Sequence, residues 1–186
     1  MPPKAKVSKE EVINAAVTIV RQSGTQAINA RSVASLLKCS TQPVFSNFVS
    51  MDELRFAVVE KADALYNEYI QEEIASNKYP PYKASGMAYI RFAKEEKELF
   101  KLLYMRDRAE EGIKESAAFG ELMETVIKPS IGLEGQEATL FHLEMWAFVH
   151  GIATMFATGY LNLKWELVSK MLTDAYMGMR KQYGME

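Results

Sequence analysis

The sequence has one cysteine, Cys39, and two histidines among its 186 residues. A disulfide framework within the chain and a four-cysteine zinc site are therefore excluded. Glycine-rich phosphate loops, nucleophile elbows and HExxH motifs are missing as well. His142 and His150 are eight residues apart, which is too far for the usual helical metal pair. The sequence thus predicts no enzyme, no metal site and no cofactor.

The first ten residues, MPPKAKVSKE, lack the apolar run of a secretory signal, which predicts a cytoplasmic protein. The longest stretch without Asp, Glu, Lys or Arg covers the 19 residues from 145 to 163. Its length approaches that of a membrane span, but it includes His150, Asn162, two threonines and two glycines, and its flanks carry no basic cluster. We interpret it as a helix buried all round in a folded core.

Charge is distributed unevenly along the chain. Residues 1–50 carry six basic and two acidic side chains, whereas the other 136 residues carry 16 basic and 22 acidic ones. A basic head on an acidic body suggests that the head meets a polyanion, although chance clustering explains the charge alone equally well. The apolar fraction of 48% is enough to bury a core.

Apolar residues recur at helical spacing through nearly the whole chain, and no useful length alternates as a strand would. Ser8 and Glu11 predict a capping box, and Gly24 the end of the first helix. Asn29 and Ser40 are expected to cap the next two helices. The predicted fold is all-α with about nine helices, over the approximate ranges 9–23, 30–38, 41–48, 51–75, 82–94, 97–107, 114–127 (before Pro129), 136–160 and 165–183.

The stretch 29–54, NARSVASLLKCSTQPVFSNFVSMDEL, predicts a helix-turn-helix, because two short helices joined near Cys39 precede a longer one. Apolar spacing predicts that the first short helix turns Val33, Ala34, Leu36 and Leu37 inward, and that Val44 and Phe48 anchor the second. The side chains left facing outward are short, uncharged and hydrogen-bonding around one aromatic ring: Thr41, Gln42, Phe45, Ser46 and Asn47. Such a face suits base edges in a major groove.

This segment resembles the tetracycline repressor-like (TetR/AcrR) family of bacterial transcription regulators. The resemblance covers the first 50 residues, and the remainder matches only in length and layout. It is carried by Asn29, Ala34, Ser40 and the run Val44–Phe48, followed by Ser50–Leu54. Three residues depart from the family pattern, since Phe45, Met51 and Lys38 stand where tyrosine, lysine and glycine are common.

The resemblance implies a helix-turn-helix DNA-binding domain over residues 1–50 and a helical effector-binding and dimerisation domain over residues 51–186. The expected function is a homodimeric repressor on a palindromic operator, released by a small-molecule effector. The expected base contacts are Thr41, Gln42 and Ser46. The expected phosphate contacts are Asn29, Arg31, Lys38, Ser40, Phe45, Asn47, Lys4 and Lys6. Asn29 and Ser40 are equally well explained as helix caps, and Phe45 as a packing residue rather than a contact to sugar-phosphate or a thymine methyl.

The body supplies two further sets of candidates. Aromatic and thioether side chains make adaptable cavity walls, although a filled core explains each of them as well. The effector-pocket candidates are Phe92, Phe100, Tyr104, Met123, Phe141, Met145, Trp146 and His150. The last two helices have more apolar surface than one small body needs, which predicts a dimer interface. Its candidates are Phe148, Ile152, Phe156, Trp165, Val168, Leu172 and Tyr176.

A second hypothesis assigns the same fold but a function without DNA binding. Phe45 and Met51 weaken the expected grip on the phosphate backbone, so the chain could instead be a helical protein-interaction adaptor whose head has lost DNA affinity. Replacing Gln42 by alanine distinguishes the two, since only a DNA-binding head would change its selectivity.

Overall fold

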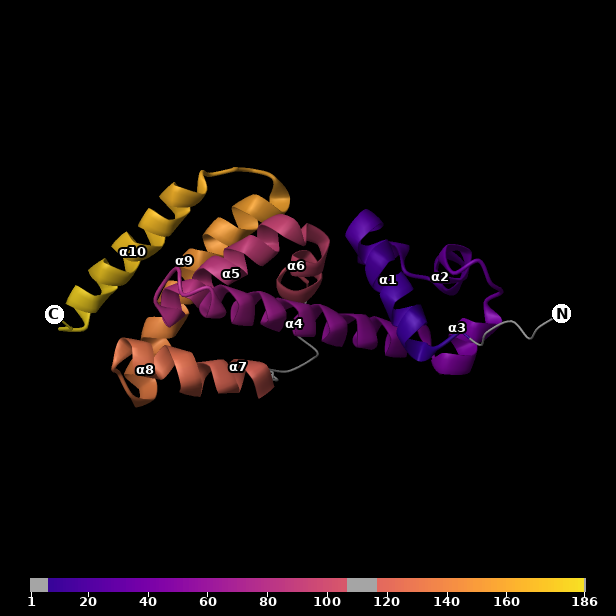
Figure 1. Ribbon diagram of the computed structural model, residues 1–186, viewed down its shortest axis with the longest axis horizontal. Coiled ribbons are helices and arrows are strands. Elements are labelled where there is room, and N and C mark those ends of the chain that lie inside the picture. The colour runs from indigo at the N-terminus through magenta and orange to yellow at the C-terminus, as the bar shows by residue number, and fades with distance from the viewer. Residues whose placement is uncertain (1–6, 107–116, 186) are drawn as a thin grey trace. The chain divides into compact units, whose positions relative to one another are not determined.

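The structure, a computed structural model, describes residues 7–106 and 117–185, and the regular elements in these ranges are all helical (Figure 1). The all-α prediction is therefore confirmed. In the ranges described, α7, η2 and α8 follow one another without a break. The elements are α1 (Lys9–Ser23), the 3-10 turn η1 (Thr25–Ala27), α2 (Ala30–Leu36), α3 (Gln42–Asn47), α4 (Met51–Ala75), α5 (Pro81–Glu95), α6 (Lys97–Tyr104), α7 (Ala117–Leu122), the π-helical turn η2 (Met123–Ile127), α8 (Lys128–Ile131), α9 (Gly135–Thr158) and α10 (Trp165–Gln182).

The chain divides into two compact units, and the division falls inside α4. The head unit consists of residues 1–65 and 96–106, and so holds α1, α2, α3, the first part of α4, and α6. The body unit consists of residues 66–95 and 107–186, and holds the rest of α4 with α5 and α7 to α10.

The core of the head unit forms around α1, which packs against α2, α3 and α6. Val12, Ala16 and Val20 recur on one side of α1 and are fully buried. Val33 of α2 and Val44 of α3 are also fully buried. The apolar spacing of the sequence thus closes one shared core that fixes the orientation of the two short helices.

Local hydrogen bonds set where the first helices begin. Ser8 Oγ accepts from the Glu11 amide at 3.2 Å while the Ser8 amide donates to the Glu11 carboxylate at 2.8 Å, which confirms the predicted capping box. Asn29 caps α2 by accepting from the Ser32 amide at 2.9 Å. The prediction that Ser40 caps α3 is wrong, because α3 begins one residue later and Thr41 occupies the cap position.

The turn between α2 and α3 contains a residue in the left-handed region, Lys38, with a φ of 53°. Left-handed backbone brings Cβ close to the following carbonyl oxygen and so favours glycine. A second difference from the sequence prediction lies just before this turn. Leu36, the last residue of α2, is 43% exposed and not inward, whereas Leu37 after it is half-buried.

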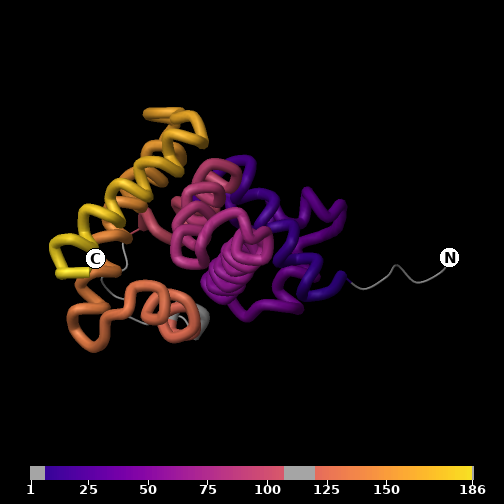
Figure 2. The backbone as a smooth tube through the Cα atoms, turned by 60° about the vertical axis from the view of Figure 1, so that its left-hand side comes forward, coloured from indigo at the N-terminus to yellow at the C-terminus, as the bar shows by residue number. Residues whose placement is uncertain are grey.

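In the body unit, α5 packs along α9, and α10 packs against both (Figures 1 and 2). Gly86 allows this close approach, since a Cβ atom there would lie 3.1 Å from Leu172 Cδ2. These helices contribute large buried side chains to the core of the body unit: Met87, Ile90, Phe92, Phe141, Val149, Phe156, Val168 and Leu172.

Two predictions about the body helices need correction. The helix expected to end before Pro129 continues to Ile131, because Pro129 falls in the first turn of α8, where its missing amide costs little, and Gly132 then ends the helix with a φ of 69°. The uncharged stretch 145–163 is not buried all round, since Trp146 is 38% exposed and Tyr160, just past the end of α9, is 81% exposed. Among the described helices α9 is long and apolar enough to span a membrane, with 39% of its most apolar window buried.

We predict that Lys38→Gly raises the free energy of unfolding by about 1 kcal/mol relative to Lys38→Ala, because only glycine relieves the left-handed strain. Both variants remove the same charge, so their difference isolates the backbone effect. Urea unfolding followed by circular dichroism measures it. Equal stability of the two variants would show that this turn stores no strain.

Candidate functional site

The orientation of α3 follows from two buried side chains. Val44 is fully buried and Phe48, just past the end of the helix, is 2% exposed. Because these anchor one side, Gln42, Phe45 and Ser46 lie on the opposite, exposed side. Phe45 is 56% exposed. We call this exposed side, with the half-buried Thr41 and Asn47 at its ends, the outer face of α3.

Hydrogen bonds within the head unit use several of the donors on this face. The Ser46 hydroxyl donates to the Gln42 carbonyl at 2.9 Å. The Asn47 amide donates to the Pro43 carbonyl at 2.8 Å and to the Val7 carbonyl at 3.2 Å. Within the described part of the chain, the Gln42 side-chain amide makes no hydrogen bond. It is therefore the most available donor-acceptor pair on the outer face.

Four of the predicted phosphate contacts lie at the N-terminal end of α2 and in the turn after it, and Phe45 and Asn47 lie on α3. Arg31, Lys38 and Ser40 are exposed. Asn29 is also exposed, but its side chain is held by the cap and by a bond to the Ala27 carbonyl at 3.3 Å. Lys4 and Lys6 lie outside the described residues.

The carboxylates that begin α4 are both partnered. Asp52 pairs with Arg55 at 2.7 Å. Glu53 accepts from the Val49 amide at 2.7 Å and pairs with Lys9 at 3.3 Å, and these contacts, the first above all, hold the pKa of Glu53 below its ordinary value. Lys9 also lies 4.8 Å from the centre of the Phe48 ring. The negative charge that follows α3 in the sequence is thus largely engaged within the head unit.

The predicted effector-pocket residues fall in two different units. Phe100 and Tyr104 belong to the head unit, where their ring centres are 5.2 Å apart. The others lie in the body unit, where Phe141 and Met145 are buried in one cluster and Met123 packs against it. Phe92 is fully buried, whereas Trp146 is 38% exposed.

Two tyrosine–histidine hydrogen bonds join α5 to α9 in the body unit. Tyr82 Oη lies 3.1 Å from His142 Nδ1, and Tyr89 Oη lies 2.9 Å from His150 Nδ1. The Trp146 ring stacks on the His150 ring with centres 4.9 Å apart. The effector-pocket candidate His150 therefore has a hydrogen-bond partner within the protein, as expected for a core histidine. Sequence reasoning missed both tyrosines, because 60 and 61 residues separate the members of each pair.

Burial keeps these histidines neutral. It lowers the pKa of His142 to about 4 and shifts the pKa of His150 downward as well. It also raises the pKa of both tyrosine hydroxyls, so the hydroxyls stay protonated. Each pair thus joins α5 and α9 as an uncharged hydrogen bond near neutral pH.

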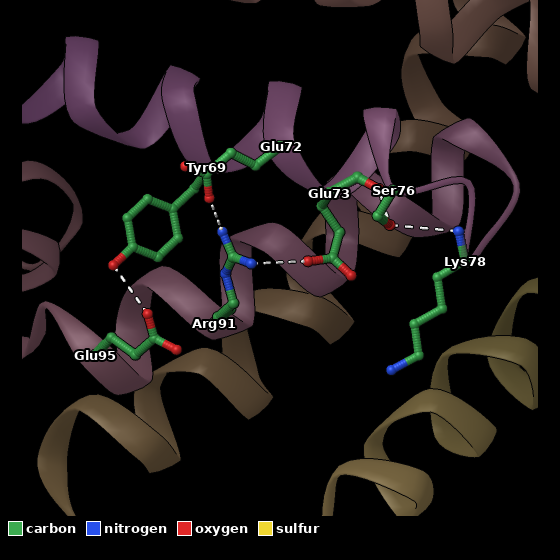
Figure 3. A network of polar contacts seen from close by, with 7 residues as sticks. All are labelled: Tyr69, Glu72, Glu73, Ser76, Lys78, Arg91 and Glu95. Atoms are coloured by element: carbon green, nitrogen blue, oxygen red, sulfur yellow. Dashed lines mark hydrogen bonds and ion pairs between the residues drawn. The ribbon is translucent and has the colours of Figure 1, made fainter.

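An ionic network ties the end of α4 to α5 within the body unit (Figure 3). Arg91 donates to Glu72 at 2.7 Å and to Glu73, which is 7% exposed, at 3.2 Å. The guanidinium lies 4.5 Å from the centre of the Tyr69 ring, and the Tyr69 hydroxyl donates to Glu95 at 2.9 Å. Arg91 thereby compensates a carboxylate that would otherwise be buried without a partner.

The predicted dimer-interface residues are mostly enclosed by the body unit itself. Ile152, Phe156, Val168 and Leu172 are at most 3% exposed, and Phe148, Trp165 and Tyr176 are half-buried. The most apolar stripe of each helix faces the chain's own core. Four large apolar side chains that these helices expose belong to a different set, which we call the α9/α10 outer face: Leu140, Leu143, Leu167 and Met177.

Comparison with known proteins identifies the class. A family model described as the tetracyclin repressor-like C-terminal domain matches residues 82–175, half of the chain. No curated protein matches the sequence at a significant level. The match covers most of the body unit together with α6, whereas the sequence resemblance covers residues 1–50, so two separate parts of the sequence indicate the same family.

Solved structures share the fold over nearly the whole chain. A TetR-like transcriptional regulator from Rhodococcus sp. RHA1 is 15% identical, with a TM-score of 0.64, and the alignment covers 99% of this chain and all of that one. The multidrug binding protein EbrR, complexed with imidazole, is 16% identical, with a TM-score of 0.58 and coverage of 90% and 93%. A TetR family member from Streptomyces coelicolor A3 is 17% identical, with a TM-score of 0.58 and coverage of 90% and 96%.

An all-α chain with a helix-turn-helix head and a helical body has the architecture of a helix-turn-helix regulator. With the family model matching half of its length, the chain belongs to the TetR family, whose members are transcriptional regulators and not enzymes.

We predict that stability falls as pH drops from about 6.5 toward 4, because the unfolded chain then binds a proton that the buried His142 does not. The loss at the acid end reaches roughly 3 kcal/mol for this residue. His142→Gln, which keeps an acceptor for Tyr82, should flatten the dependence. Urea unfolding at a series of pH values measures it, and an unchanged slope in the variant would contradict the assignment.

Proposed function

We propose that this protein is a cytoplasmic, homodimeric bacterial repressor that binds a palindromic operator and is released by a small-molecule effector. In this proposal residues 1–50 bind DNA, and residues 51–186 bind the effector and form the dimer. The outer face of α3 carries the proposal: a short helix is held by Val44 and Phe48 so that an uncharged, hydrogen-bonding surface points to solvent. A surface helix without such a task ordinarily carries Lys and Glu.

Base contact is assigned to Thr41, Gln42 and Ser46. Gln42 is the strongest candidate, because a glutamine amide can bind the N6 and N7 edge of adenine through two hydrogen bonds. Ser46 acts as an acceptor, since its proton is engaged by the Gln42 carbonyl. Arg31, Lys38, Ser40 and Asn29, with Lys4 and Lys6, are assigned to phosphates, which position the protein without reading sequence. Asn47 contributes mainly by ordering the end of α3, since its donors are engaged.

A second copy of the chain is the proposed occupant of the α9/α10 outer face. Leu140, Leu143 and Ala147 recur at helical spacing on the exposed side of α9. Leu167 and Met177 add apolar surface on α10, which packs against α9. Two helices from each copy would form a four-helix bundle. A symmetric pair also presents two α3 helices to two half-sites, as a palindromic operator requires.

The effector is proposed to bind in the body unit, among Phe92, Met123, Phe141, Met145, Trp146 and His150. The similarity to a multidrug binding protein complexed with imidazole supports a small-molecule ligand. Release requires the effector to bind the DNA-free form more tightly than the DNA-bound form.

The alternative, a protein-interaction adaptor, draws support from the apolar exposure of Phe45 and of Val49, which is 95% exposed. An adaptor head would show no sequence preference among DNA duplexes. Selection of duplexes therefore decides between the two functions.

We predict that the full chain enriches a palindromic sequence from a random duplex pool at low salt. Gln42→Ala should weaken binding to that sequence by about five- to 150-fold per half-site, the worth of one bidentate base contact, and should relax the preference at one base pair. Gln26→Ala, at another exposed glutamine of the head unit, is the matched control and should change neither. Fluorescence anisotropy measures the affinities. Failure to enrich any sequence would contradict DNA recognition.

We predict that Leu143→Glu converts the dimer to a monomer. Each copy would then bring one unpaired carboxylate into the apolar interface of the four-helix bundle, where burying a charge without a partner is costly. Phe56→Glu places the same charge on an exposed apolar position of α4, where Phe56 is 64% exposed, and should leave the dimer intact. Sedimentation equilibrium gives the masses. A dimer that survives Leu143→Glu would move the interface away from this face.

A further inference from the structure

One residue of the outer face of α3 has no role in hydrogen bonding. Phe45 projects its ring from the middle of the helix and is 56% exposed, whereas its neighbours Val44 and Phe48 are buried. Simple packing does not explain such an exposed ring, because those two neighbours already supply the apolar anchor of α3. A phosphate contact fits poorly as well, since a phenyl ring has no proton to donate to a phosphate oxygen.

The surroundings of Phe45 leave few other functional groups on the face. Gln42 precedes it by three residues and therefore lies beside it on the same side of the helix. Ser46 comes next, with its proton engaged by the Gln42 carbonyl. The exposed middle of α3 is therefore one amide next to one aromatic ring, with the hydroxyl oxygens of Ser46 and Thr41 as further polar groups on the face.

Base chemistry then limits what this pair can recognise. In the major groove, adenine offers the acceptor and donor that a glutamine amide matches, and thymine is the base that presents a methyl group. The carboxylates of Asp52 and Glu53 at the start of α4 are engaged with Arg55 and Lys9. Their repulsion of the DNA backbone is thereby reduced.

We propose that Phe45 is a specificity-determining residue that contacts the C5-methyl group of a thymine in each half-site, close to the adenine contacted by Gln42. This inference rests on the proposed DNA-binding function. It replaces a phosphate contact for Phe45 with direct base readout, and it makes the preferred operator rich in A·T pairs where α3 enters the groove.

Burying one methyl group against an apolar ring changes affinity by about fourfold. Two half-sites then give a combined change of about 16-fold for a symmetric dimer if the contacts are independent. Changes of this size are well within the range of a titration.

The test removes the methyl groups and nothing else. The full chain first selects its preferred duplex from a random pool, and each thymine is then replaced in turn by deoxyuridine, which pairs identically. The wild-type protein should lose about fourfold in affinity at one thymine per half-site. Phe45→Tyr, which keeps the ring, should retain that loss. Phe45→Ala should bind the unmodified duplex more weakly and be indifferent to deoxyuridine.

Phe56→Ala is the matched control, because it truncates another exposed phenylalanine of the head unit and should keep the wild-type response. Circular dichroism establishes that each variant is folded. If the pool yields a preferred duplex but wild-type protein is indifferent to every deoxyuridine, or if Phe45→Ala responds as the wild type does, the Phe45 assignment is wrong and DNA binding stands. If no duplex is selected at all, the proposed function itself fails.

Discussion

The packing of Val44 and Phe48 into the core around α1 is the interaction on which the functional surface depends. A helix of six residues is too short to be stable by its own hydrogen bonds. Burying each of these side chains contributes about 1.5–3 kcal/mol, which is enough to hold α3 in one orientation. That orientation decides which residues meet solvent. The chemistry of the head is thus a consequence of two apolar anchors spaced four residues apart.

The body uses a different strategy, in which polar contacts add specificity to an apolar core. The two tyrosine–histidine pairs join α5 and α9 where the surroundings are largely buried, so each hydroxyl and each Nδ1 has a partner. The Arg91 network does the same between α4 and α5. Such groups are costly when unpaired, and they therefore favour one register of the packed helices over others.

Local patterns predicted most of the head. The capping residues Ser8 and Asn29, and the inward residues Val33, Val44 and Phe48, all depend on contacts within a few turns of the chain, which a sequence makes visible. Ser40 failed as a cap because a one-residue shift in the start of α3 moves the cap position, and such boundaries depend on tertiary packing. Lys38 was marked by its place in a turn where glycine is usual, and it does adopt the left-handed backbone.

Long-range features of the body were less visible. The hydrogen bond between Tyr82 and His142 joins residues 60 positions apart, and no periodicity in the sequence predicts it. The apolar stripe of α9 was apparent, but periodicity alone does not tell a core-facing side from a side that faces solvent when both are apolar. Burial distinguishes the two sides of α9 only when α5 and α10 are packed against it. Ile152 and Phe156 are then enclosed, whereas Leu140 and Leu143 are exposed.

The absence of a side chain at Gly86 limits which substitutions this chain can accept during evolution. A methyl group there would lie 3.1 Å from Leu172 Cδ2, and Leu172 is almost fully enclosed, so it has little room to give way. An alanine at position 86 therefore requires Leu172 to shift by a few tenths of an ångström, and a smaller side chain at 172 removes that requirement. Positions 86 and 172 should therefore tend to change together during evolution, because the packing of α10 on α5 depends on both.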